Sequence, residues 1–206
     1  MSKNPRISIG LTVYNGEKYV AQAIESLLAQ TFTDFELIIS DNGSSDNSPA
    51  ICQDFADRDD RIRYVQHEEN HGANWNYNYV FSLGRGEYFK WADQDDLCSP
   101  EFLERCIEIL DEKPEVVWCH SASVKIDAKG RVVQGVGNTR NARGEVCRSP
   151  QAHRRFRDIL LHSTHWGIRC SGVFRRNVLE QTGLYRPYYG SENILCAEVA
   201  LAGRYQ

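Results

Sequence analysis

Residues 7–48 read ISIGLTVYNGEKYVAQAIESLLAQTFTDFELIISDNGSSDNS, in which two apolar runs flank a helical pattern. In the run at 6–13, large apolar residues alternate with small ones, which predicts a strand with one face in the core. The run at 35–40 is short and almost wholly apolar, as expected of a buried strand. Between the two runs, apolar residues recur at helical spacing at Val20, Ala23, Ile24, Leu27 and Leu28. A strand, a helix and a second strand in this order predict a βαβ unit with parallel strands.

The same alternation continues to about residue 110. The expected elements are strands at 61–66 and 87–92 and helices at 72–84 and after Pro100. Asn15, Ser48 and Ser99 are expected to cap the helices that follow them, because a side-chain oxygen there can accept from a free backbone N–H. Together these elements predict an α/β protein with a mostly parallel, doubly wound sheet and helices on both faces.

The second half of the chain carries a weaker pattern. The expected elements are strands at 115–123 and 124–133, the latter folded about a turn at 128–130, a loop at 134–150, a helix at 151–162, a strand at 168–174, a short helix ending at Gly183 and a helix at 192–203. The loop at 134–150 is longer than most connections in compact domains. Loops of that length are either functional lids or disordered, and both readings stay open.

Composition excludes some classes of protein. The 206 residues carry a formal net charge of −4, which argues against a general nucleic-acid binder. The seven cysteines are scattered and contain no C-x-x-C pair, which favours free thiols in a reducing compartment. No apolar run approaches the roughly 20 residues of a membrane span. These features predict a cytoplasmic protein, with peripheral attachment to the inner face of a membrane left open.

Carboxylates are crowded in WADQDDLC, residues 91–98, where Asp93, Asp95 and Asp96 repel one another directly after a predicted strand. The ends of the first two strands, at Thr12–Glu17 and Asp41–Asp46, are also polar, and ligands of parallel sheets bind at this edge. The chain has neither a G-x-G-x-x-G nor a G-x-x-x-x-G-K-[ST] motif. A bound diphosphate would therefore need a metal ion, and carboxylates suit Mg²⁺ or Mn²⁺. Taken alone, the three carboxylates could equally form a solvated turn.

The stretch at 7–48, together with NHGANWNYNYVFSLGRGEYFKWADQDDLCSPEFLE at 70–104, resembles glycosyltransferase family 2, whose members have the GT-A fold. The resemblance covers nearly all of residues 5–110 in order and spacing. It implies one catalytic domain over 1–206, with a Rossmann-like sheet and a smaller acceptor-side part. Residues 1–110 would bind the nucleotide-sugar, and residues 111–206 would form the acceptor-side half, cut short at its C-terminal end.

The resemblance also implies roles for individual residues. Contacts with the nucleotide-sugar fall to Thr12, Val13, Tyr14, Asn15, Glu17, Asp41, Asn70, Gly72, Asn78, Asp93 and Asp95. Asp95 and Asp96 would bind the metal ion, and Asp41 the nucleotide base. The catalytic residues would be Asp96 and Glu192, the latter as the base that takes the acceptor's proton. Two departures from the family pattern stand out: Thr12 replaces a common proline, and the usual A-R-N is Asn76, Tyr77 and Asn78.

The implied function is metal-dependent transfer of a sugar from a nucleoside-diphosphate sugar, a UDP-sugar, to an acceptor hydroxyl with inversion. The cofactor would be Mn²⁺ or Mg²⁺. The acceptor would be a saccharide, a lipid-linked sugar or another hydroxyl compound, as in polysaccharide biosynthesis. Asn193 could instead occupy the place of the family's catalytic aspartate, so a nucleotide-sugar binding module without turnover is one alternative. A sugar nucleotidyltransferase is another. The donor sugar, the acceptor and the oligomeric state stay open.

Overall fold

The computed structural model describes residues 4–121, 124, 126–133, 151, 172–182, 184–187 and 191–205. The side chains at 191–194, 197, 200, 204 and 205 lie outside the description as well. The expected loop at 134–150, most of the helix at 151–162 and the start of the strand at 168–174 also fall outside it.

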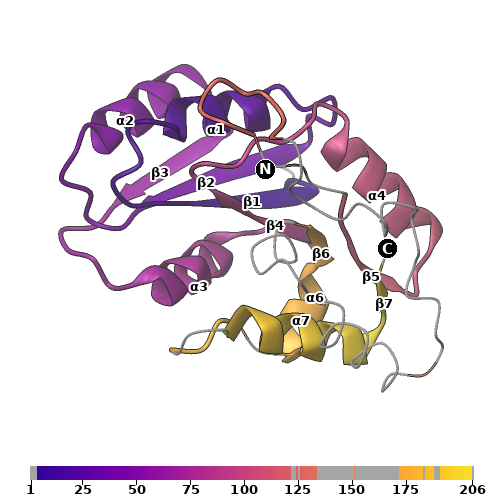
Figure 1. The fold of residues 1–206 in the computed structure, drawn as a ribbon. Helices are drawn as coiled ribbons and strands as arrows, with labels where there is room; N and C mark the ends of the chain where they lie inside the picture. The colour runs from indigo at the N-terminus through magenta and orange to yellow at the C-terminus, as the bar shows by residue number, and fades with distance from the viewer. Residues whose placement is uncertain are drawn as a thin grey trace.

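Seven strands and six helices make up the described part of the fold (Figure 1). The strands are β1 (Ile7–Val13), β2 (Phe35–Asp41), β3 (Ile62–Gln66), β4 (Tyr88–Asp93), β5 (Val116–Cys119), β6 (Val173–Arg175) and β7 (Arg204–Tyr205). The helices are α1 (Val20–Leu28), α2 (Ser48–Arg58), α3 (Ala73–Leu83), α4 (Phe102–Glu112), α6 (Arg176–Thr182) and α7 (Ser191–Ala202).

All seven strands form one sheet in the order β3-β2-β1-β4-β6-β5-β7. The chain moves outward from β1 to β3, then crosses back to place β4 on the other side of β1. The strand order therefore reverses between β1 and β4. In the described sheet, β6 alone runs against its neighbours. The predicted α/β architecture with a mostly parallel sheet is confirmed.

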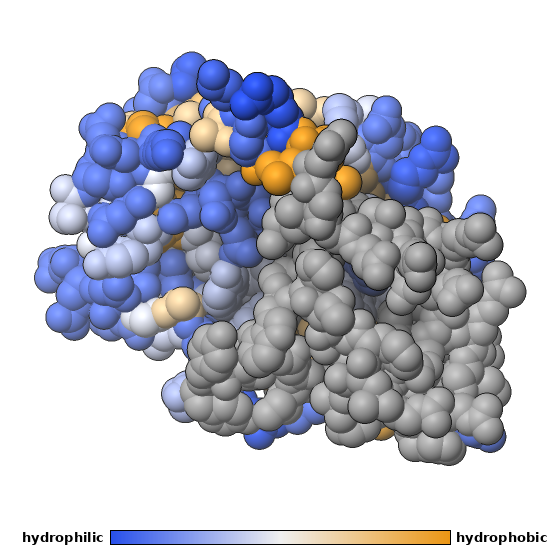
Figure 2. Space-filling model, in the orientation of Figure 1, coloured by the Kyte–Doolittle hydropathy of each residue, from blue (hydrophilic) through white to orange (hydrophobic). Residues whose placement is uncertain are grey.

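Helices cover both faces of the sheet and enclose two cores (Figure 1). The first core lies under α1, α2 and α4, and β1 contributes alternate residues to it, among them Ile9 and Leu11. The second core lies under α3, α6 and α7, where Phe89 and Trp91 of β4 pack. The described surface over α1, α2 and α3 is mainly hydrophilic (Figure 2), as expected when the apolar faces of these helices are buried.

The small residues of β1 have a packing role. A Cβ atom added to Gly10 would lie 2.6 Å from Cγ2 of Val80 and 2.8 Å from the ring of Phe89. Glycine at this position lets α3 approach the sheet closely enough to bury Val80 completely. The alternation of large and small residues at 6–13 therefore reflects two faces that pack against helices at different distances.

Several predicted boundaries were wrong. Asn47 and Glu101 occupy the N-cap positions of α2 and α4, neither with a side-chain capping hydrogen bond, so Ser48 and Ser99 are not the caps. The strand predicted at 115–123 ends at Cys119. The predicted strand pair at 124–133 is reduced, in its described residues, to the bridge between Ile126 and Val132 around the expected turn. Local sequence does not determine these ends, because they depend on which distant segments pair with them.

Candidate active site

The carboxyl ends of β1, β2 and β4 lie side by side where the strand order reverses. Thr12 is paired with Asp93 across β1 and β4, and Val13 is paired with Asp41 across β1 and β2. Because the three strands are parallel, the loops that follow them leave the sheet at one edge. The structure thus brings together four residues that the sequence assigned to one site.

Asn15 shapes the loop after β1. It has a positive φ of 50°, a conformation that asparagine tolerates better than most residues. Its N–H donates to Oγ of Ser44 at 2.9 Å, and its side-chain oxygen accepts from the N–H of Ser45 at 2.8 Å. The prediction that Asn15 caps the next helix was wrong, because α1 begins at Val20 behind a cap residue without a side-chain hydrogen bond.

The loops after β1 and β2 are joined by further hydrogen bonds. Gly16 N–H donates to Oγ of Ser48 at 2.8 Å, and Glu17 N–H donates to Asp46 at 3.0 Å. The Glu17 carboxylate accepts from the N–H of Asn47 at 2.9 Å. Asp46 also accepts from the N–H of Ser48 at 3.0 Å, so its carboxylate holds the turn before α2. The two loops therefore form one cross-linked wall along this edge of the sheet.

Gln94 connects the acidic turn to β1, and the sequence reading missed it. Its side-chain oxygen accepts from the N–H of Tyr14 at 2.8 Å, and its NH₂ group donates to the Tyr14 carbonyl at 3.1 Å. A Cβ on Gly16 would lie 2.4 Å from the Gln94 oxygen, so this approach requires a glycine. The one signal in the sequence was an amide set between carboxylates directly after a strand.

Asp41 is fully buried at the end of β2. One carboxylate oxygen accepts from the N–H of Ser44 at 2.9 Å, and the other accepts from the Tyr64 hydroxyl at 3.2 Å. Burial, and then the charge of Asp41, raise the pKa of Tyr64, so its hydroxyl stays protonated and donates. Protein partners thus orient the Asp41 carboxylate at the strand end.

Asn42 was also missed, although it holds the turn that contains Asn70 and Gly72. Its amide NH₂ donates to the side-chain oxygen of Asn70 at 2.9 Å, and its oxygen accepts from the N–H of His71 at 3.0 Å. The same Asn70 oxygen accepts from the N–H of Gly72 at 2.7 Å. Gly72 has a positive φ of 92°, which favours glycine. Asn70 and Gly72 are thereby held beside the end of β2.

Tyr77 occupies the position where the resembling family commonly has arginine. Its hydroxyl donates to the carboxylate of Asp93. The ring of Tyr77 stacks on Tyr185, with ring centroids 4.7 Å apart and planes 18° apart. Asp93 therefore receives a hydrogen bond from α3 but no positive charge from that helix position.

The hydrogen bonds of Asn78 do not join it to the residues at the carboxyl ends of β1, β2 and β4. Its NH₂ group donates to the carbonyl of Tyr185 at 2.7 Å, and its oxygen accepts from the N–H of Tyr185 at 2.9 Å. This pair of hydrogen bonds ties α3 to the segment that follows α6. The amide of Asn78 therefore has a structural use in this arrangement.

The acidic cluster, defined as Asp93, Asp95 and Asp96, forms a turn at the end of β4. Asp95 and Asp96 are exposed, whereas Asp93 is half-buried. Burial, and then the charges of Asp96 and Asp95, raise the pKa of Asp93, which the Tyr77 hydroxyl and Lys90 counteract. Partial desolvation of its carboxyl group at this turn, and then the charge of Asp95, raise the pKa of Asp96, again opposed by Lys90. The cluster therefore favours the binding of a cation.

The described residues supply part of a metal site. In the described segments, no group of three or more His, Cys, Asp or Glu side chains is arranged to hold a metal ion. Asp95 and Asp96 nevertheless expose hard oxygen donors, which fit Mg²⁺ or Mn²⁺. Both ions accept water and phosphate oxygens as their remaining ligands, so two carboxylates suffice when a diphosphate is also bound.

Glu192 and Asn193 lie in the first turn of α7, and their side chains are outside the description. Glu198, on the same helix, forms an ion pair with Arg186.

The fold and the site define a Rossmann-like α/β protein. The edge of its sheet where ligands would bind carries carboxylate and amide side chains in place of a glycine-rich phosphate loop. The chain belongs to glycosyl transferase family 2, because the model of that family matches residues 8–183. The resemblance seen in the sequence is thereby confirmed.

Individual proteins agree with this assignment. EpsH of Bacillus subtilis, named as a glycosyltransferase, is 28% identical over 188 residues, which cover 91% of this chain and 52% of EpsH. TarS 1–349 of S. aureus superimposes with a TM-score of 0.71 at 21% identity, covering 97% of this chain and 56% of that chain. The mannosyltransferase PcManGT of Pyrobaculum calidifontis, solved with GDP-Man and Mn²⁺, superimposes with a TM-score of 0.65 at 15% identity, covering 94% of this chain and 51% of that chain.

These similarities confirm the GT-A type of fold. The chain spans about half the length of EpsH and of both structural neighbours. Within the part of the chain that the structure describes, no helix is both long enough and apolar enough to cross a bilayer.

Proposed function

We propose that the chain transfers a sugar from a UDP-sugar to an acceptor hydroxyl, with inversion and with Mn²⁺ or Mg²⁺ as cofactor. The observation that carries this proposal is the register of β1 with β2 and β4. It aligns Thr12 with Asp93 and Val13 with Asp41 at the point where the strand order reverses. Membership of glycosyl transferase family 2 supplies the class of reaction.

The nucleotide is proposed to lie along the ends of β1 and β2. The cross-linked wall there offers Tyr14, Asn15 and Glu17, and the turn held by Asn42 offers Asn70 and Gly72. Because hydrogen bonds within the protein already hold these groups, nucleotide binding would order few side chains. A structure of TarS in complex with UDP-GlcNAc supports a UDP-sugar as the donor class.

The diphosphate is proposed to lie beside the acidic cluster. Asp95 and Asp96 would hold the divalent cation, and Asp93 would shape the donor pocket from its position opposite Thr12. When bound, the cation supplies Lewis-acid stabilisation of the charge that grows on the leaving diphosphate. Support comes from PcManGT, which was solved with both a nucleotide-sugar and Mn²⁺.

Glu192 is the proposed general base. It belongs to the first turn of α7, where the helix dipole favours a charged carboxylate, the form that accepts a proton. Inversion needs one displacement and therefore one base.

The acceptor is a hydroxyl of a saccharide or of a lipid-linked sugar. A cytoplasmic site, free or against the inner face of a membrane, agrees with the five described cysteines, all of which are free thiols.

The donor class is tested with a panel of nucleotide-sugars, each with and without MnCl₂. UDP-sugars with Mn²⁺ should raise the melting temperature of the chain, and the same donors should release UDP when an acceptor is supplied. Release of UDP is measured with a coupled assay. The proposal fails if no nucleotide stabilises the fold under either condition.

The base is tested with Glu192→Gln, and Glu25→Gln on the exposed face of α1 serves as a matched control. Glu192→Gln should leave the Kd for the donor unchanged and lower turnover about 10²–10⁴-fold, because general-base catalysis is lost. Equal turnover by Glu192→Gln and the parent would reject this role. Donor binding without turnover in the parent, across all acceptors, would favour the binding-module alternative.

A further inference from the structure

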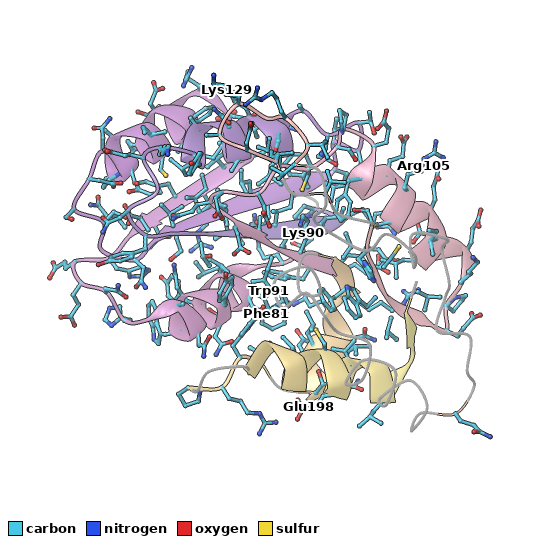
Figure 3. The ribbon with its side chains drawn as sticks, in the orientation of Figure 1. Phe81, Lys90, Trp91, Arg105, Lys129 and Glu198 are labelled. Carbon is cyan, nitrogen blue, oxygen red and sulfur yellow. The ribbon has the colours of Figure 1, made fainter. Side chains whose placement is uncertain are left out.

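Tyr185, in the segment that follows α6, packs against a residue that contacts the acidic cluster. It is only 8% exposed. Its ring stacks on the ring of Tyr77 of α3, and it meets the ring of Trp91 at a right angle, with centroids 5.3 Å apart and planes 85° apart. Trp91 in turn lies beside Phe81 (Figure 3). One parallel and one perpendicular ring contact together restrict the orientation of the Tyr185 ring.

Hydrogen bonds also hold the backbone of Tyr185. The Asn78 side chain donates to its carbonyl at 2.7 Å and accepts from its N–H at 2.9 Å. The carbonyl of the next residue, Arg186, accepts from the NH₂ group of Asn74. Asn74 and Asn78 are four positions apart in α3, so they lie on one face of that helix. The segment that follows α6 is therefore fastened along α3 by hydrogen bonds as well as by the ring stack.

Tyr77 connects Tyr185 to the acidic cluster. Its carbonyl accepts from Nε1 of Trp91 at 2.9 Å, and its hydroxyl donates to Oδ1 of Asp93. A tyrosine hydroxyl lies on the axis of its ring, so the orientation of the ring decides where the hydroxyl points. Because Tyr185 stacks on that ring, it restricts the direction in which Tyr77 donates. A carboxylate has two oxygens, so Asp93 can accept from Tyr77 and still accept from a ligand.

We propose that Tyr185 is a positioning residue for donor binding, which acts by holding the Tyr77 hydroxyl on Asp93. This inference rests on the proposed function, in which Asp93 shapes the donor pocket. A carboxylate that is already oriented loses less conformational freedom when the nucleotide-sugar binds, and the affinity is higher for that reason. The second half of the chain thereby contributes to donor binding.

The test measures the Kd for UDP with Mn²⁺ by calorimetric titration. Tyr185→Leu removes the ring and should weaken binding about three- to tenfold, because the Asp93 carboxylate must then be ordered on binding. Tyr185→Phe keeps the ring and should retain the affinity. The matched control is Phe55→Leu, which removes a half-buried ring from the last turn of α2 and should bind UDP like the parent.

A double variant separates positioning from a general effect on the fold. Tyr77→Phe removes the hydroxyl that meets Asp93, so it should weaken UDP binding to a similar extent as Tyr185→Leu. Adding Tyr185→Leu to Tyr77→Phe should then weaken binding no further, because both changes remove the same interaction. Losses that multiply in the double variant would overturn the inference, and so would an unchanged Kd in folded Tyr185→Leu.

Asn78→Ala is a second variant for the case in which Tyr185→Leu does not fold. It removes two hydrogen bonds from the backbone of Tyr185. It should weaken UDP binding in the parent but not in the Tyr77→Phe background, and an equal effect in both backgrounds would contradict positioning through Tyr77. A parent chain that binds no UDP, with or without Mn²⁺, would overturn the proposed function itself. Equal UDP binding by the parent and folded Tyr185→Leu would overturn this inference alone.

Discussion

Tyr77 is the residue at which the site departs most clearly from the pattern of its family. A phenol donates a hydrogen bond to Asp93 but brings no charge. Burial and the neighbouring Asp96 raise the pKa of Asp93, and the Tyr77 hydroxyl partly reverses that rise. Because the folded pKa of Asp93 lies above its unfolded value, ionised Asp93 weakens the fold at pH values above the folded pKa. Tyr77 reduces this penalty.

Tyr77→Phe should therefore lower the free energy of unfolding by about 1–2 kcal/mol at pH 8, since a hydrogen bond to a charged group is lost. The loss should shrink as the pH falls and Asp93 takes up a proton in both proteins. Urea denaturation of both proteins from pH 8 to pH 4 measures this difference in the free energy of unfolding. Tyr79→Phe, on the same helix with its ring stacked on Trp75, is the control. A loss that does not change with pH would contradict this account of Asp93.

At the scale of single residues, the sequence predicted which residues lie at the strand ends. It did not predict which side chains hold those strand ends in place. Thr12, Asp41 and Asp93 could be predicted because each follows from a strand and its end. Gln94 and Asn42 could not be predicted, because their partners are backbone groups that meet them only after distant strands and loops have come together. The same reason explains why Asn15 was taken for a cap.

Among the elements, β2 contains a buried carboxylate, Glu36, although its sequence pattern is mainly apolar. Glu36 is buried and accepts from the Ser8 hydroxyl at 2.6 Å and from the Arg85 guanidinium at 2.6 Å. The same carboxylate accepts from the N–H of Arg85 at 2.9 Å. Burial alone would raise the pKa of Glu36, but the hydrogen bonds from Arg85 and Ser8 outweigh it and hold the pKa below its ordinary value. This network fixes the turn that leads into β4 and so into the acidic cluster.

Glu36→Gln should destabilise the chain by about 2 kcal/mol at pH 7, because charged hydrogen bonds at a buried site are weakened. A depressed folded pKa means that this stabilisation is present above the unfolded pKa of about 4.3 and is lost as the pH falls through the folded value. Melting temperatures of parent and variant should therefore converge between pH 5 and pH 3. A constant difference over that range would contradict the role of the ionised carboxylate.

The elements of the first half were predictable because each strand and helix there has its own strong periodicity. In the second half, β5 is short because β6 pairs with it only at Trp118 and Cys119. The partner strand comes from Val173–Arg175, more than fifty residues later, and no local pattern indicates such a pairing. Strand ends of this kind depend on tertiary structure, which explains the overlong strand predicted at 115–123.

For the whole molecule, the reversal of strand order between β1 and β4 connects the fold to the proposed chemistry. It places the cross-linked wall, the buried Asp41 and the acidic cluster at one edge of the sheet. The sequence predicted this arrangement because polar residues directly follow three of its predicted strands, the first, the second and the fourth along the chain. The second half of the chain, where the acceptor would bind, could not be predicted to the same depth because its motifs are weaker.

The most direct test of the central claim is calorimetric titration of UDP into the chain with Mn²⁺, repeated for Asp95→Ala. The exposed Asp60→Ala, at the turn between α2 and β3, is the matched control for loss of one carboxylate. We expect the parent and Asp60→Ala to bind UDP with Mn²⁺ and to lose most of that affinity in EDTA. Asp95→Ala should bind weakly under both conditions. Equal, Mn²⁺-dependent binding by Asp95→Ala and the parent would contradict the account of this site.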